Sequence, residues 1–161
     1  MQSTLRDSLG YALVRAFREV NRASGRALAP FGLSAEQAHI LLALWIEGPM
    51  KVGELQRWLA LGSGTLTGAL DRMDKAKLVR RVPDPADGRV FRVEPLGFAP
   101  RERAAVQRSL EAMEEAVMTK LTEGERRQLL RLLEKVETAA RAAGEEEGPK
   151  SPRRRGGPTG R

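Results

Sequence analysis

The chain contains no cysteine and only one histidine, His39, among its 161 residues. The missing cysteines exclude disulfide bonds, thiol catalysis, and zinc or iron–sulfur sites with cysteine ligands. A metal site built from histidines is not expected either, because such a site needs several of them. The sequence also has no glycine-rich phosphate loop and no serine–histidine–aspartate set. It therefore predicts a protein that is not an enzyme and has no cofactor or metal.

Aromatic residues and long apolar runs are scarce as well. Aromatic side chains make up 4% of the chain, although a hydrophobic content of 41% is enough for one domain with a core. No run approaches the roughly 18 apolar residues that a membrane-spanning helix needs. The segment after Met1 lacks the pattern of a secretory signal. We therefore expect no membrane partner and a cytoplasmic location.

Positive charge, by contrast, is abundant. Lysine and arginine total 28 against 21 aspartate and glutamate, a formal net charge of +7, which favours a polyanionic partner such as nucleic acid. Residues 144–161 are basic and lack the large apolar side chains that build a core. We expect them to form a disordered basic tail after a single domain at residues 1–143.

Residues 63–75 carry the clearest functional pattern. Leu66, Leu70 and Met73 recur at intervals of four and three, so a helix here would bury them together with Ala69. The opposite face of this helix holds hydroxyls, small residues and charges: Ser63, Thr65, Thr67, Gly68, Asp71, Arg72 and Lys75. Such a smooth polar face can approach another surface closely.

A β-hairpin is expected immediately after this helix. Residues 78–82 and 90–93 are rich in β-prone side chains, and the turn formers of residues 83–89 separate them. A helix with a smooth face followed by a hairpin with a basic tip is the layout of a winged helix-turn-helix. The helix would enter the major groove of DNA, and the hairpin would reach the adjacent minor groove.

Amphipathic helices flank this DNA-reading unit, which we place at residues 33–95. Apolar stripes predict helices at about residues 5–27 and in two segments of 100–142. A single winged helix has no obvious place to bury three extra amphipathic helices, whereas a second copy of the chain would cover them. We therefore expect a mainly α fold with a small antiparallel β-hairpin wing, in which the N- and C-terminal helices form a homodimer.

With these features in place, the sequence resembles the MarR family of winged helix-turn-helix transcriptional regulators. The resemblance spans about residues 5–142, and the segments 33–37, 52–55 and 63–73 contribute to it. Its most specific part is the wing motif RRVPDPADGR at residues 80–89.

The resemblance implies a dimeric, sequence-specific regulator that binds a pseudo-palindromic double-stranded DNA operator, and we take it to be a repressor. It implies that Arg89 enters the minor groove while Asp87 orients it. Members of the family often bind small anionic or phenolic compounds, so such an effector is a candidate ligand. We further expect contacts from Arg72, Lys75, Thr65 and Thr67 on the recognition helix and phosphate contacts from Arg80 and Arg81 on the wing. The candidate DNA-binding residues are Ser63, Thr65, Thr67, Gly68, Asp71, Arg72, Lys75, Arg80, Arg81, Asp87 and Arg89.

Two positions depart from the family pattern. Lys77 stands where the family usually has glycine, so it must either adopt a left-handed conformation or end the helix differently. Pro95 stands where the second wing strand normally continues, and proline cannot donate to a strand ladder. We therefore expect a short second strand.

Several alternatives remain open on the sequence alone. His39 is either a core or interface histidine or part of an effector pocket. Trp45 and Trp58 are expected in the core. Arg89 could instead form only a surface ion pair with Asp84 or Asp87. The alternative function is a winged helix that contacts another protein and binds no specific DNA.

Overall fold

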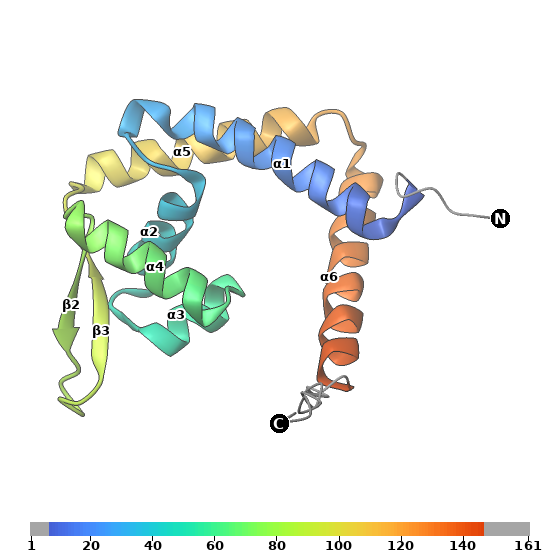
Figure 1. The fold of residues 1–161 in the computed structure, drawn as a ribbon. Helices are drawn as coiled ribbons and strands as arrows, with labels where there is room; N and C mark the ends of the chain where they lie inside the picture. The colour runs from blue at the N-terminus through green and yellow to red at the C-terminus, as the bar shows by residue number, and fades with distance from the viewer. Residues whose placement is uncertain (1–6, 147–161) are drawn as a thin grey trace, which may run out of the picture. The chain divides into compact units, whose positions relative to one another are not determined.

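The computed structural model describes residues 7–146, and the chain forms two compact units that divide after Val117 (Figure 1). The second unit contains helix α6 (Glu123–Glu146). The rest of the expected tail, residues 147–161, lies outside the described residues. The first unit contains α1 (Leu9–Leu28), the 3-10 helix η2 (Ala29–Phe31), α2 (Ala35–Glu47), β1 (Met50–Lys51), α3 (Val52–Leu59), α4 (Ser63–Lys75), β2 (Val79–Pro83), β3 (Phe91–Pro95) and α5 (Pro100–Met118).

The core of the first unit is built around α2, which is apolar on nearly all sides. Ser34 begins this helix with a capping box, because its hydroxyl accepts the Gln37 N–H and the Gln37 side chain accepts the Ser34 N–H. Around α2 pack side chains from α3, α4, the sheet and α5. The largest fully buried residues are Leu28, Ile40, Leu41, Leu44, Leu55, Leu66, Leu70, Met73, Val79, Val93 and Val106.

The three strands form one antiparallel sheet in the order β1-β3-β2. β2 and β3 pair over five positions, from Val79 opposite Pro95 to Pro83 opposite Phe91. The expectation of a shortened second strand is therefore wrong. Pro95 is tolerated because it ends the strand, and the next N–H, that of Leu96, donates to the Leu78 carbonyl at 2.8 Å. This mainly helical fold with a small antiparallel sheet confirms the predicted winged helix-turn-helix.

Helices α1 and α5 lie together in the first unit (Figure 1). The Ser109 hydroxyl of α5 donates to the Ala27 carbonyl of α1 at 2.8 Å. Near this point Leu28 and Val106 are fully buried. Most of the remaining apolar side chains of α1 face outward, and Phe17 is 68% exposed.

Two of the residues that we expected in the core are not there. Trp58 is 47% exposed, because Leu55 occupies the inward face of the short helix α3. His39 is exposed on α2, so its assignment to the core is wrong, while its assignments to an interface or an effector pocket stay predictions. Trp45 is partly buried against the core, and its ring meets that of Phe98 edge to face at 5.5 Å.

Lys77 follows the C-cap of α4 and adopts the left-handed conformation, with φ of 59°. Its N–H donates to the Asp74 carbonyl at 3.0 Å, and the N–H of Leu78 donates to the Met73 carbonyl at 2.9 Å. These two bonds form a Schellman motif, which satisfies the last carbonyls of the helix and turns the chain into β2. Of the two alternatives for Lys77, the structure shows the strained one.

Candidate nucleic-acid interface

Helix α4 separates its apolar and polar residues onto two faces. Leu66, Ala69, Leu70 and Met73 are at most 1% exposed, and they anchor the helix against the core. The predicted contact residues lie on the other face, where Gly68 is half-buried and the rest are exposed. No side chain caps the start of the helix at Gly62, and its first turn has no acidic residue. The positive end of the helix is therefore available to an anion.

Two ion pairs connect the polar face of α4 to neighbouring elements. The Asp71 carboxylate lies 2.6 Å from Arg81 Nη2, which joins α4 to the wing strand β2. The Glu36 carboxylate, in the first turn of α2, lies 3.1 Å from Arg72 Nη2. Of the predicted phosphate-contacting residues, Arg80 pairs with Glu94 at 2.7 Å. The fold therefore pairs two predicted residues, Asp71 and Arg81, with each other. It pairs the predicted residue Arg72 with Glu36, which was not predicted.

The wing turn is organised by Asp84, which the sequence reasoning missed as a structural residue. Its side chain is only 3% exposed and lies 2.9 Å from Arg92 Nε and 3.6 Å from Lys51 Nζ. Its Oδ1 accepts the N–H groups of Ala86 at 2.9 Å and Asp87 at 3.2 Å. An aspartate that bonds the N–H two residues on is a common turn signal, and this signal could have identified it.

These contacts keep the Asp84 carboxylate ionised. The backbone hydrogen bond from Ala86 is the largest influence, and with Asp87, Lys51 and Arg92 it lowers the pKa of Asp84 despite the opposing effect of burial. Because the charged carboxylate holds the turn closed, the turn geometry depends on that charge. Arg92 and Lys51 are consequently engaged by the wing itself.

Arg89 extends from the tip of the wing, with a side chain that is 94% exposed. The Asp87 Oδ1 lies 3.5 Å from its Nε and accepts its backbone N–H at 3.1 Å. The structure therefore brings Asp87 and Arg89 together, as the wing motif suggested. Asp84, the other carboxylate considered as a partner for Arg89, is instead bound to Arg92 and Lys51.

A groove of about 750 Å³ lies between α4, the start of α3 and the wing. Lys51, Arg81 and Arg89 supply three cationic side chains to its wall, and Thr67 reaches it from α4. Its remaining lining residues are Val52, Gly53, Val90 and Phe91. The groove is thus open, basic and bounded by the two elements that a winged helix presents to DNA.

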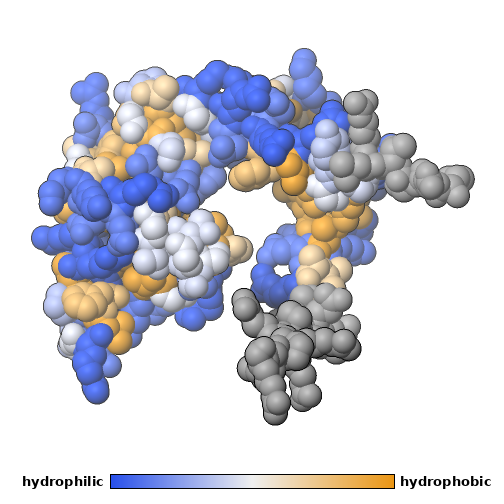
Figure 2. All heavy atoms as spheres, in the orientation of Figure 1, coloured by the Kyte–Doolittle hydropathy of each residue, from blue (hydrophilic) through white to orange (hydrophobic). Residues whose placement is uncertain are grey.

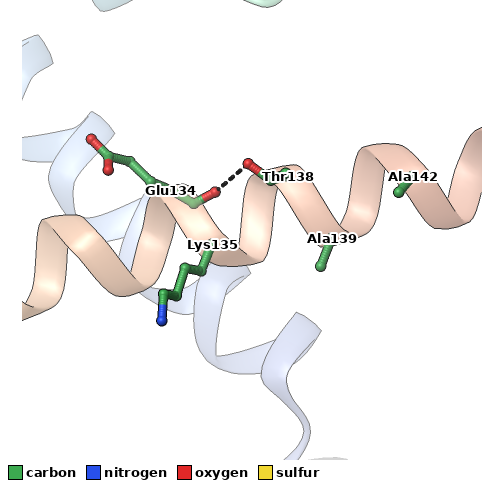
Figure 3. Close-up of a pocket in the computed structure, with 5 residues that line it drawn as sticks. All are labelled: Glu134, Lys135, Thr138, Ala139 and Ala142. Atoms are coloured by element: carbon green, nitrogen blue, oxygen red, sulfur yellow. Dashed lines mark hydrogen bonds between the residues drawn. The ribbon is translucent and has the colours of Figure 1, made fainter.

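A second hollow lies along α6 and is lined by Glu134, Lys135, Thr138, Ala139 and Ala142 (Figure 3). All five residues come from one helix, and Figure 3 shows the Thr138 hydroxyl bonded to the Glu134 carbonyl within that helix. These side chains form a shallow surface without convergent polar groups, so the hollow does not have the form of a binding site.

No group of three or more histidine, cysteine, aspartate or glutamate residues within residues 7–146 could hold a metal ion. No single helix in the same range is long and apolar enough to cross a membrane; one bent pair, Leu9–Phe31 with Ala35–Glu47, meets the length and composition criteria only together.

Comparison with known proteins connects this geometry to a family. The model of the MarR family matches residues 33–91, which run from the start of α2 to the wing. This part of the chain is therefore similar to the MarR family.

Individual relatives extend the match beyond residues 33–91. The chain is 29% identical over 136 residues to the HTH-type transcriptional regulator MgrA from Staphylococcus aureus, which covers 84% of this chain and 91% of MgrA. A 46-residue segment is 50% identical to the uncharacterized HTH-type transcriptional regulator YsmB from Bacillus subtilis, covering 29% of this chain and 32% of YsmB.

Solved structures agree with the fold. A cysteine-to-serine mutant of MarR from E. coli, complexed with operator DNA, is 25% identical, with a TM-score of 0.70 over 83% of this chain and 99% of that one. The homologues are transcriptional regulators and not enzymes. The chain is thus similar to DNA-binding transcriptional regulators along most of its length.

Proposed function

We propose that this chain is a homodimeric repressor that binds a specific, pseudo-palindromic double-stranded DNA operator. The observation that carries the proposal is the joint exposure of the polar face of α4 and of Arg89 at the wing tip. In this arrangement α4 enters the major groove and Arg89 enters the adjacent minor groove, whose negative potential attracts a guanidinium. Residues Ser63, Thr65, Thr67, Gly68, Asp71, Arg72 and Lys75 then face the major groove.

The basic groove between α4 and the wing supports the same proposal. A DNA strand that leaves the major groove for the minor groove must pass between the recognition helix and the wing. The groove presents Arg81 and Arg89 there, and Arg80 lies on the neighbouring strand β2. Asp71 holds the Arg81 guanidinium at the surface, and Glu94 holds that of Arg80. Both guanidinium groups can contact phosphates there.

Exposed apolar side chains on two helices support dimerisation. On α1 they are Leu9, Val14, Phe17 and Val20, and on α6 they are Leu129, Leu130, Leu132 and Leu133. Figure 2 shows hydrophobic residues, in orange, along the visible side of α6. Apolar stripes of this size are normally covered, and a symmetric dimer would cover both while presenting two copies of α4 about 34 Å apart.

Release of the operator by a small anionic or phenolic effector is the regulatory part of the proposal. A repressor of this kind would act in the cytoplasm, where its operator lies. A ligand that binds the DNA-free form better than the DNA-bound form would lower operator affinity.

The test is selection of bound sequences from a random duplex pool, followed by titration of the selected duplex across a salt series. Wild type should select an inverted repeat and show a steep dependence of affinity on salt. Arg89→Ala should lose about tenfold in operator affinity. Arg108→Ala is the matched control, because it removes one positive charge from an exposed position on α5, and it should bind nearly as wild type does.

Three results would refute the proposal. They are no enriched sequence, binding that is indifferent to salt, and equal affinities for Arg89→Ala and wild type. The absence of an enriched sequence, or binding indifferent to both Arg89 and salt, would instead favour a winged helix that contacts another protein.

A further inference from the structure

Arg72 on the recognition helix is bound by Glu36, which is not among the candidate DNA-binding residues. Its Nη2 donates to Glu36 Oε2 at 3.1 Å. Glu36 lies 36 positions earlier in the chain, in the first turn of α2. The Arg72 side chain is nevertheless 66% exposed, so the pairing does not remove it from the surface.

The pairing gives the guanidinium a definite place on α4. Arg72 Nη1 lies 3.4 Å from the point that a β-carbon on Gly68 would occupy, so the guanidinium lies directly over Gly68. Gly68 is one turn closer to the start of the helix than Arg72. Helical side chains point toward the N-terminus in this way, and the N-terminal part of a recognition helix is the part that contacts base edges.

The chemistry of the pair suits a positioning role better than a stabilising one. An ion pair between exposed side chains contributes little to folding stability. A guanidinium has five N–H donors, so Arg72 keeps donors for a base while Glu36 engages Nη2. Arginine reads guanine through two parallel hydrogen bonds, which require a fixed orientation of the guanidinium plane.

We propose that Glu36 is a positioning residue for DNA recognition, because it fixes Arg72 over Gly68 and so raises discrimination between the operator and other DNA. This inference rests on the proposed function. The carboxylate of Glu36 also repels every phosphate equally, which lowers affinity for DNA of any sequence. Glu36 therefore affects specificity through Arg72 and overall affinity through its own charge.

The experiment measures the ratio of affinities for the selected operator and for a scrambled duplex of the same length, at one salt concentration. Glu36→Gln removes the charge and the ion pair, so binding to the scrambled duplex should strengthen while the ratio falls about threefold. Glu36→Asp keeps the charge but retracts the carboxylate, so the ratio should fall while binding to the scrambled duplex stays at the wild-type value. Arg72→Ala should lower the ratio about tenfold.

The double variant Glu36→Gln with Arg72→Ala decides the interpretation. If Glu36 acts through Arg72, the double variant should have the same ratio as Arg72→Ala alone. A ratio that is unchanged or raised in Glu36→Gln, or one that falls equally with and without Arg72, would overturn the inference. A wild-type ratio near one would overturn the proposed function itself and this inference with it, so the two failures are distinguishable.

Discussion

Replacing Lys77 by glycine should stabilise the protein, although the change removes a side chain. Lys77 has φ of 59°, a left-handed conformation that its β-carbon disfavours. The strain is about 1–2 kcal/mol for a residue other than glycine. Glycine removes this strain but loses roughly 0.5–1 kcal/mol through its greater freedom in the unfolded chain. The expected net gain in the free energy of unfolding for Lys77→Gly is therefore between about 0 and 1.5 kcal/mol, with a central value of about 0.75 kcal/mol.

Backbone hydrogen bonds should keep residue 77 in the left-handed conformation when lysine is replaced by glycine. The N–H groups of Lys77 and Leu78 close the Schellman motif on the carbonyls of Asp74 and Met73. Neither bond involves the Lys77 side chain, so Lys77→Gly keeps both. For a chain of this size, 1 kcal/mol corresponds to a rise in melting temperature of about 2–4 °C. Melting should be compared at one protein concentration, since the proposed dimerisation would contribute to the apparent stability.

Lys77→Ala is the matched control. It removes the lysine side chain and its charge but keeps a β-carbon, and hence the left-handed strain. Its free energy of unfolding, from urea denaturation, should lie close to that of wild type and below that of Lys77→Gly. A Lys77→Gly variant no more stable than Lys77→Ala would refute the reasoning, because it would show that the left-handed conformation carries no measurable strain.

Two further predictions concern the recognition helix and the wing. Leu70→Ala should lower the free energy of unfolding by about 2–5 kcal/mol, since Leu70 is fully buried between α4 and the core; a loss below about 1 kcal/mol in urea denaturation would contradict this. Asp84→Asn should accelerate hydrogen exchange at the Ala86 and Asp87 amides at neutral pH, because the amide side chain no longer neutralises Arg92 and Lys51. The pKa of Asp84 is lowered by its folded-state contacts, so its stabilisation of the turn is present above the unfolded pKa. In wild type this stabilisation should be lost only as the pH falls through the folded-state pKa, which lies below the ordinary value for an aspartate. Equal exchange in wild type and Asp84→Asn at pH 7 would contradict the role of the charge.

The wing shows where local sequence signals are sufficient and where they are not. The turn formers of residues 83–89 predicted a hairpin, and β2 and β3 form it. The inability of proline to donate to a strand ladder led us to expect that Pro95 would shorten β3, which is wrong because Pro95 lies at the strand end and still pairs with Val79. The role of Asp84 depends on Lys51 and Arg92, which come from two other positions in the chain. These ion pairs depend on which strands pair in the sheet, and the pattern of one sequence does not predict that pairing.

Trp58 and Lys77 also show what residue type alone does not predict. Trp58 lies on the same helix as the buried Leu55, yet it is largely exposed, because a short helix buries only a narrow face. Lys77 had two possible conformations on sequence grounds, and the hydrogen bonds to Met73 and Asp74 select the left-handed one. Packing and hydrogen bonding thus decided what residue type alone left open.

The sequence by itself determined the features that depend on neighbours along the chain. The spacing of Leu66, Leu70 and Met73 placed α4 and its buried face, and the motif at residues 80–89 located the wing. Only the tertiary structure decided which distant residues meet, such as Glu36 with Arg72 and Asp71 with Arg81. The reason is physical: periodicity and turn chemistry act over a few residues, whereas these ion pairs form only after α2, α4 and the sheet have packed on one core.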